Sequence, residues 1–210
     1  RIDQEHLDLV IISKSSTPDR TEYMLGKNND SPLPHLKEAG KDLERMGVDY
    51  IVIPCITAHY FYKDLSDNIK VPIIHIIKET AQYLKDRGVK SAGIMATEGT
   101  VKSGLFQNEL YENGIRPIIP SQTGQEYISG IIYNNVKAGL PVNMEHFAKA
   151  KEELTGKGAE VIILGCTELS LIKRDGNIGP GFIDALEVLA MCGITKCGKR
   201  VKKEYLNLIT

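Results

Sequence analysis

Short apolar runs alternate with longer amphipathic stretches along this chain, and each pattern predicts a different element. The apolar runs are typical of buried strands, and the stretches between them have the polar and apolar spacing of helices. We expect strands at 8–13 (DLVIIS), 50–54, 71–77, 91–96 (SAGIMA) and 117–120, and helices at 34–46, 78–86 and 124–138. This order indicates an α/β fold with mostly parallel sheets covered by helices.

One segment of the chain occurs twice. The segment 35–55 (HLKEAGKDLERMGVDYIVIPC) is repeated at 146–166 (HFAKAKEELTGKGAEVIILGC), with matched positions 111 residues apart. Each copy predicts a helix, a glycine turn and an apolar strand that ends in a cysteine. Ligands bind at the carboxyl ends of parallel strands. We therefore expect the two halves to direct their thiols, Cys55 and Cys166, at one ligand between them.

The repeat also predicts the domain organisation. We expect two similar domains related by a pseudo-two-fold axis, one formed by 1–88 with 180–210 and the other by 89–179, with the site in their cleft. The second half opens with the strand at 91–96, and the first half has no equivalent. We expect the chain as given to begin inside a domain, about one strand–helix unit short. An edge strand covered in another way is the alternative.

Composition and charge restrict the class of protein. The 210 residues are 42% hydrophobic and 25% charged, as is usual for a globular protein, and the formal net charge is -1. Because charges of both signs are interspersed, nothing indicates a nucleic-acid or membrane partner. One basic run spans 196–203, which we interpret as the solvated end of a C-terminal helix and not as a binding patch. No apolar stretch approaches the roughly 20 residues of a membrane span.

The four cysteines do not have the spacing of a disulfide framework, a zinc site or a CxxC redox motif. We expect reduced thiols, no metal and a cytoplasmic location. No glycine-rich phosphate loop is present either.

Both repeated cysteines are followed by a threonine and by the predicted start of a helix, in PCITAH (54–59) and GCTE (165–168). Backbone N–H groups converge at a helix start, where they bind a carboxylate and lower the pKa of a thiol. A single cysteine there is more often a small buried side chain. Two at matched positions favour acid/base chemistry, in which one thiolate removes the α-proton of an amino acid and one thiol protonates the opposite face.

PCITAH, GCTE and PDRT (18–21) resemble the aspartate/glutamate racemase superfamily, most closely its cofactor-independent aspartate racemase branch. The resemblance extends from Asp8 to about Ile183. It implies two α/β domains, a homodimer, no cofactor, and Cys55 and Cys166 as the catalytic pair. It also implies that Arg20 holds the substrate side-chain carboxylate and that Lys137 reaches the site from the other domain. Further pocket residues implied by the resemblance are Thr57, Thr97, Thr100, Thr167 and Glu168.

From the residues alone, these positions have simpler interpretations as well. Arg20 lies in the long polar loop 14–33, and loops of that length in compact domains are commonly functional, but an exposed loop arginine is the simpler interpretation. Lys137 alone would be a surface lysine. Thr97–Thr100 (TEGT) would be a turn that caps a helix. His59 we expect to pack or cap near the first thiol without a catalytic role.

Two departures from the family pattern affect the functional hypothesis. Ile56 stands where the family has an asparagine, and the family's Gly-Gly-Met-Gly-Pro turn is absent. Glutamate racemases resemble this chain less, because their second motif has a histidine where Glu168 stands. Two intact cysteines with an arginine for a second carboxylate favour an acidic amino acid, and aspartate is the favoured substrate. The alternatives are a broad-specificity or glutamate-type racemase, or a relative that binds an amino acid without turnover.

Overall fold

The computed structural model describes residues 3–210 and has the α/β architecture with parallel sheets that the sequence predicts. Its strands are β1 (Ile51–Val52), β2 (Ile73–Ile74), β3 (Ser91–Ala96), β4 (Arg116–Ile118), β5 (Val161–Gly165) and β6 (Phe182–Asp184). Its α-helices are α1 (Arg20–Met24), α2 (Leu33–Arg45), α3 (Tyr62–Asn68), α4 (Ile76–Asp86), α5 (Glu98–Lys102), α6 (Leu105–Glu112), α7 (Gln122–Ser129), α8 (Met144–Gly156), α9 (Thr167–Asp175) and α10 (Ala185–Lys196). The 3-10 helices are η1 (Asp3–Glu5), η2 (Ile56–Phe61) and η4 (Lys203–Tyr205), and η3 (Gly130–Val136) is a π-helix.

The larger sheet has the strand order β4-β3-β5-β6, with every neighbouring pair parallel. Successive residues of β5 point to opposite faces. Val161 and Ile163 join a core under α4, α6 and α10, whereas Ile162 and Leu164 join a second core under α7, α8 and α9. Burial of both faces explains why β5 is a continuous apolar run without polar alternation.

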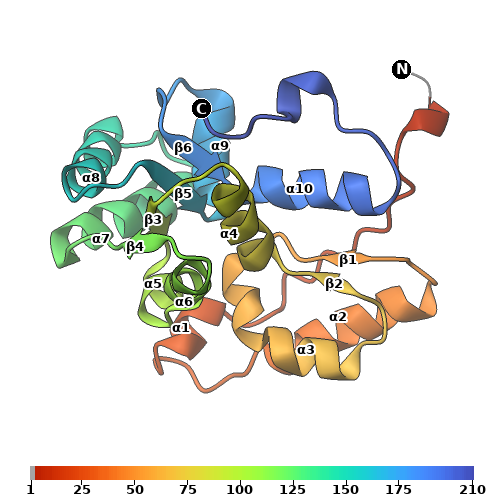
Figure 1. Cartoon of the computed structure of the whole chain (residues 1–210). Coiled ribbons are helices and arrows are strands. Elements are labelled where there is room, and N and C mark those ends of the chain that lie inside the picture. The colour runs from red at the N-terminus through yellow and green to blue at the C-terminus, as the bar shows by residue number, and fades with distance from the viewer. Residues whose placement is uncertain (1–2) are drawn as a thin grey trace.

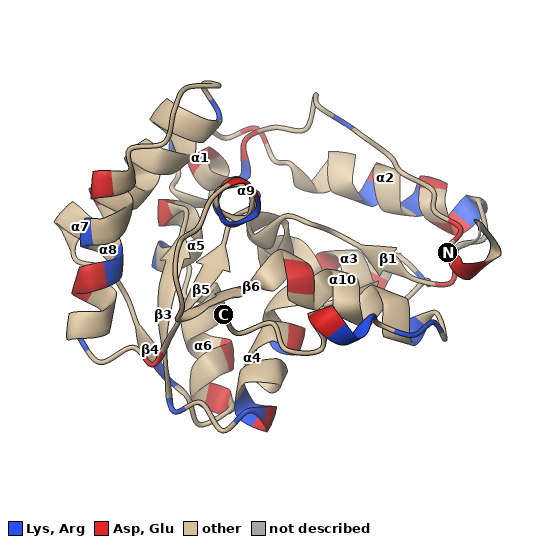
Figure 2. Cartoon of the chain, turned by 90° about the horizontal axis from the view of Figure 1, so that it is seen from above, with Lys and Arg blue, Asp and Glu red and all other residues tan. Residues whose placement is uncertain are grey.

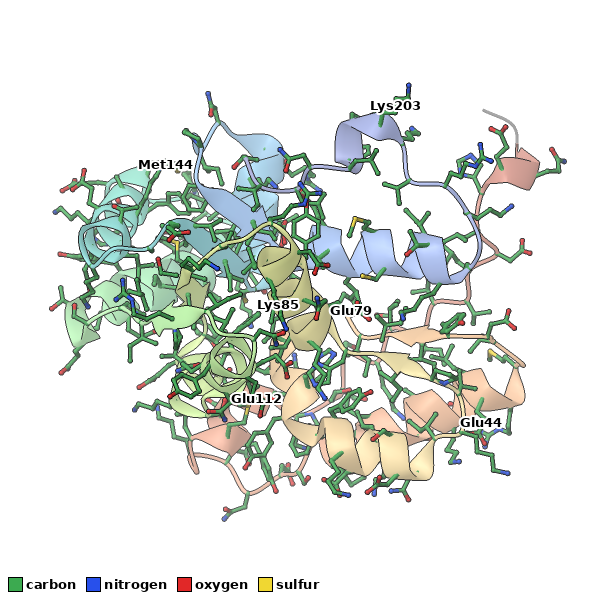
Figure 3. The ribbon with its side chains drawn as sticks, viewed as in Figure 1. Glu44, Glu79, Lys85, Glu112, Met144 and Lys203 are labelled. Carbon is green, nitrogen blue, oxygen red and sulfur yellow. The ribbon has the colours of Figure 1, made fainter. Side chains whose placement is uncertain are left out.

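The smaller sheet pairs β1 with β2 in parallel, Ile51 opposite Ile73. Helices α2 and α3 pack together beside it, and Ile51, Phe61 and Leu65 belong to their shared core (Figure 1). Helix α10 crosses from the larger sheet to contact α4 and β2. Glu79 of α4, labelled in Figure 3, lies on the α10 side and accepts a hydrogen bond from the Cys192 thiol at 3.5 Å.

The repeat extends further than the two matched sequences. In each half a helix, a strand, a cysteine and a helical segment lead to a second parallel strand and a further helix, as α2–β1–η2–α3–β2–α4 and α8–β5–α9–β6–α10. Each cysteine therefore lies between two neighbouring strands: Cys166 directly follows β5, and Cys55 follows β1 after Ile53 and Pro54. This common position lets both thiols reach one site.

The expected strand at 8–13 is wrong. These residues form no sheet pairing with the rest of the described chain, and the Leu9 and Ile11 side chains are 72% and 83% exposed. An apolar run becomes a strand only where a neighbouring strand satisfies its backbone hydrogen bonds. The loop expected at 14–33 also contains the short helix α1, which Asp19 caps through a bond from the Glu22 amide.

Residues 180–210, which we assigned to the first domain, contact both sheets: β6 pairs with β5, whereas α10 contacts α4 and β2. The domain limits stay a prediction. The basic run at 196–203 is largely exposed, as expected, but follows the end of α10 at Lys196 and so lies beyond the helix.

The charged residues are distributed over the helices with both signs interspersed (Figure 2). Among residues 3–210, no helix has the length and apolar composition needed to cross a membrane.

Candidate active site

A small cavity of about 60 Å³ lies where the two halves of the repeat meet. All nine site residues that the sequence singled out line it: Arg20, Cys55, Thr57, Thr97, Thr100, Lys137, Cys166, Thr167 and Glu168. They come from five separate segments of the chain, so the fold alone brings them together. Their roles stay predictions, although their common location no longer depends on the resemblance.

The first half contributes a thiol beside a guanidinium. Cys55 caps η2 in an extended conformation, and its Sγ lies 4.0 Å from Arg20 Nη2 and 3.3 Å from Thr57 Oγ1. The Arg20 guanidinium is held on its other side by the Pro18 carbonyl, which accepts from Nη1 at 3.1 Å. A fixed positive charge at this distance stabilises negative charge on sulfur.

The second half contributes a thiol beside a carboxylate. Cys166 caps α9 and donates from Sγ to Glu168 Oε2 at 2.7 Å, and the Thr167 hydroxyl donates to the same oxygen at 3.1 Å. Lys137 Nζ lies 3.9 Å from the other carboxylate oxygen of Glu168. The carboxylate therefore contacts both the thiol and an opposite charge.

The protonation of Cys166 differs from our expectation. We expected the start of a helix to lower the pKa of the thiol, but the pKa of Cys166 is raised well above its usual value. Burial is the main cause, and the negative charge of Glu168 and the hydrogen bond to it add to the effect. Cys166 is a neutral thiol at neutral pH because these effects outweigh the helix dipole.

Threonine hydroxyls join the two halves across the cavity. Thr21 donates to Thr97 Oγ1 at 3.3 Å, and the Thr97 and Thr100 hydroxyls lie 3.1 Å apart. Thr97 also caps α5 by accepting from the Thr100 amide. Gly99 permits this contact, because a Cβ there would lie 3.1 Å from the Thr21 Cα.

Four further cavity residues were missed by the sequence analysis: Asp19, Thr21, Tyr133 and Gly165. Tyr133 lies under the ammonium of Lys137, which is 4.7 Å from its ring centroid. Burial raises the pKa of Tyr133, so its phenol is neutral at physiological pH. Asp19 could have been found from its position before Arg20 as an N-cap, but nothing in the sequence around Tyr133 distinguished it.

Ile56 reaches the cavity wall but is largely buried in the core with Ile74 and Ile76. It presents no polar group to a ligand. Among residues 3–210, no group of three or more His, Cys, Asp or Glu side chains is arranged to hold a metal ion.

Known proteins of similar sequence and structure were compared with the chain. The model of the Asp/Glu/Hydantoin racemase family matches residues 1–192. The broad specificity amino-acid racemase RacX of Bacillus subtilis is 31% identical over 153 residues, which cover 68% of this chain and 65% of that protein. Glutamate racemase of Aquifex pyrophilus is 31% identical over 157 residues, covering 71% of this chain and 58% of that protein. The chain thus spans less than two thirds of either relative.

Among solved structures, Picrophilus torridus aspartate racemase aligns with a TM-score of 0.81 and 31% identity, covering 97% of this chain and 85% of that one. An aspartate racemase homologue from Pyrococcus horikoshii aligns with a TM-score of 0.70 and 25% identity, covering 85% and 80%. The family match extends over nearly the whole chain, and both cysteine motifs lie within it. The chain belongs to the Asp/Glu/hydantoin racemase family.

Proposed function

We propose that this protein is an amino-acid racemase that interconverts L- and D-aspartate by two-base proton transfer between Cys55 and Cys166. The observation that carries the proposal is the contrast between the two thiols in one cavity. Cys55 lies beside a guanidinium, whereas Cys166 donates a hydrogen bond to a carboxylate. A two-base racemase requires one deprotonated and one protonated group on opposite faces of the α-carbon.

Substrate binding follows from the charges around the cavity. Arg20 presents a planar fork suited to a carboxylate, and Lys137 supplies a second positive charge. The N-terminus of α9, which begins at Thr167, directs backbone N–H groups at the same space. These donors suit a substrate with two carboxylates, such as aspartate.

In one direction, the Cys55 thiolate removes the α-proton and the Cys166 thiol donates its proton to the opposite face of the carbanion. The two cysteines leave this step with exchanged protonation states. The reverse direction starts from these exchanged states: the Cys166 thiolate removes the α-proton of D-aspartate, and the Cys55 thiol protonates the opposite face. For another turnover from L-aspartate, Cys55 releases its proton to solvent and Cys166 regains one through Glu168, whose Oε2 lies 2.7 Å from its sulfur. No cofactor is needed in this proposal.

A broader amino-acid specificity is the second candidate. It is favoured by Ile56, which provides no side-chain hydrogen bond to the substrate, and by similarity to the B. subtilis broad specificity amino-acid racemase. A relative that binds an amino acid without turnover is the non-enzymatic alternative.

Chiral chromatography of separate reactions with L-aspartate, L-glutamate, L-alanine and L-lysine, without pyridoxal phosphate, distinguishes these candidates. Aspartate converted well ahead of the others supports the proposal. Similar rates for all four indicate the broad-specificity racemase. Binding of aspartate by calorimetry without any D-isomer would indicate the non-catalytic relative.

The assembly, cellular location and domain limits are also proposals. By the family resemblance we propose a homodimer, which light scattering on a sizing column would test. We propose a cytoplasmic location because none of the four cysteines is in a disulfide.

A further inference from the structure

We propose that His59 and Ser170 are a matched pair of positioning residues, each holding one reactive cysteine in place through its backbone. The inference rests on the proposed racemase function for its kinetic part only. The two residues occupy equivalent places in the repeat, since each lies four positions after its cysteine and their numbers differ by 111. Neither lines the cavity.

His59 connects the Cys55 backbone to the start of the following helix. Its side chain is buried at 3% exposure, and its Nδ1 lies 3.0 Å from the Cys55 carbonyl oxygen. On the opposite side of the ring, the Ile76 amide donates to Nε2 at 3.4 Å. Ile76 is the first residue of α4, directly after β2. The imidazole thus links the turn at Cys55 to the neighbouring strand and helix.

These contacts determine the tautomer of His59. A backbone amide only donates, so Nε2 is the acceptor and Nδ1 carries the proton that is donated to Cys55. Burial lowers the pKa of His59, which keeps the ring neutral as this arrangement requires. The rings of Tyr62 and His75 lie 6.2 Å and 5.1 Å from the His59 ring and hold it in place.

Ser170 makes the corresponding connection in the second half. Its amide and hydroxyl both lie within hydrogen-bond distance of the Cys166 carbonyl oxygen, at 3.2 Å and 3.4 Å. The single hydroxyl proton is directed mainly at Asp184 Oδ1, at 2.8 Å, and the Cys166 oxygen is its weaker second acceptor. Asp184 in turn caps α10 by accepting from the Leu186 amide. Ser170 therefore also joins its cysteine to the helix after the neighbouring strand, through a different side chain.

The arrangement has a functional consequence. Each cysteine is the N-cap residue of the helical segment that follows a strand, so the direction of its Sγ depends on the orientation of the adjoining peptide. His59 holds that peptide only for Cys55, and Ser170 only for Cys166. Loss of either residue should therefore impair one thiol and leave the other unchanged, an outcome that general destabilisation would not produce.

The test compares His59→Asn with His59→Gln. An asparagine amide lies near the Nδ1 position and keeps the bond to Cys55, whereas the longer glutamine reaches only the Nε2 position at Ile76. We expect H59N to keep most of the wild-type kcat and H59Q to lose about 10-fold, with KM within about twofold in both. Equal losses in the two variants would overturn the proposal.

Site-resolved alkylation keeps the proposal testable even if no racemisation substrate is found. The rates at which iodoacetamide modifies Cys55 and Cys166 are measured by mass spectrometry of the folded full-length chain. H59Q should slow Cys55 alone, because its sulfur moves away from Arg20, and Ser170→Ala should alter Cys166 alone. In folded variants, equal changes in the alkylation rates of both cysteines, or no change at either, would contradict the roles of His59 and Ser170.

Discussion

Cys166 Sγ donates a hydrogen bond to Glu168 Oε2 at 2.7 Å, and this contact makes the two thiols of the cavity unlike each other. The counterpart of Glu168 in the first half is Thr57, which is two residues after Cys55 and carries no charge. The repeat therefore supplies two cysteines in equivalent places, and the residues around them supply the difference. A chemically symmetric pair would have no preferred acid and base.

Replacing Glu168 by glutamine should reduce racemisation by about 100-fold, because Cys166 loses the carboxylate through which it exchanges its proton between turnovers. The fold should be retained, since glutamine has the same shape. Glu145→Gln is the matched control, because Glu145 forms an exposed ion pair with Lys149. Initial rates from L- and D-aspartate measure the effect. Wild-type rates in E168Q would show that Glu168 takes no part in proton transfer.

Each cysteine should be necessary for racemisation but not for all chemistry. Cys55→Ala and Cys166→Ala should each abolish interconversion by at least about 1000-fold, since one of the two acid/base groups is missing. Each variant should still exchange the α-proton of one enantiomer with solvent, and the two variants should select opposite enantiomers. Cys192→Ala serves as the control, because Cys192 lies outside the cavity. Racemisation retained in either cavity variant would exclude the two-thiol mechanism.

Arg20→Lys should raise KM for aspartate by about 10- to 100-fold, since a lost hydrogen bond to a charged group is worth about 1.5–3 kcal/mol. The lysine keeps the charge but not the planar fork. Arg45→Lys on the exposed side of α2 is the matched control. Steady-state kinetics measure the change, and a KM unaltered by R20K would remove Arg20 from carboxylate binding.

Stability should decrease as pH rises above the ordinary thiol pKa of about 8.5. Burial, with Glu79 nearby, raises the pKa of Cys192 to about 12, and the pKa of Cys166 is raised as well. Folded thiols stay protonated where unfolded thiols ionise, so their stabilising contribution is complete below pH 8.5 and is lost between that pH and the folded pKa.

Urea unfolding followed by circular dichroism at pH 7.5 and pH 10 measures this loss. Cys192→Ala should reduce the difference between the two pH values, whereas Cys197→Ala, at an exposed thiol, should leave it unchanged. If the free energy of unfolding changed equally between the two pH values in wild type and C192A, the loss could not be assigned to the Cys192 thiol.

Gly165→Ala should destabilise the protein by about 1–3 kcal/mol through overpacking. A Cβ there would lie 3.0 Å from the Phe106 ring and 3.3 Å from the Met95 carbonyl oxygen, and the backbone cannot move away easily. Gly130→Ala is the control, because no atom lies within 4 Å of its added Cβ. Thermal unfolding measures both. A G165A variant as stable as G130A would mean that β3 and β5 can separate at this point.

The sequence predicted those features of the fold that depend on the local pattern of apolar and polar residues. The repeat placed Cys55 and Cys166 at equivalent positions after a strand, and the structure puts both at one cavity, although Ile53 and Pro54 separate the end of β1 from Cys55. What depends on tertiary packing was missed. Tyr133 lies on a π-helix without any local signal, and the run at 8–13 has strand-like composition but no pairing partner in residues 3–210.

The sequence predicted only part of the electrostatics of the site. The start of α9 indicated a lowered thiol pKa for Cys166, but the sequence does not reveal that the Glu168 side chain turns back onto the sulfur. The raised pKa follows from that rotamer and from burial, both of which require the folded structure. The same holds for the link from His59 to Ile76, which joins residues 17 positions apart.

The central claim is that two thiols act on opposite faces of the α-carbon, and deuterium labelling tests it most directly. L-aspartate is incubated with the protein in deuterium oxide, the enantiomers are separated early in the reaction, and each is analysed for deuterium by mass spectrometry. Two thiols predict D-aspartate with deuterium at the α-carbon and recovered L-aspartate that still carries protium. Deuterium entering recovered L-aspartate as fast as D-aspartate forms would indicate a single base, and would contradict the assignment of Cys55 and Cys166 as partners.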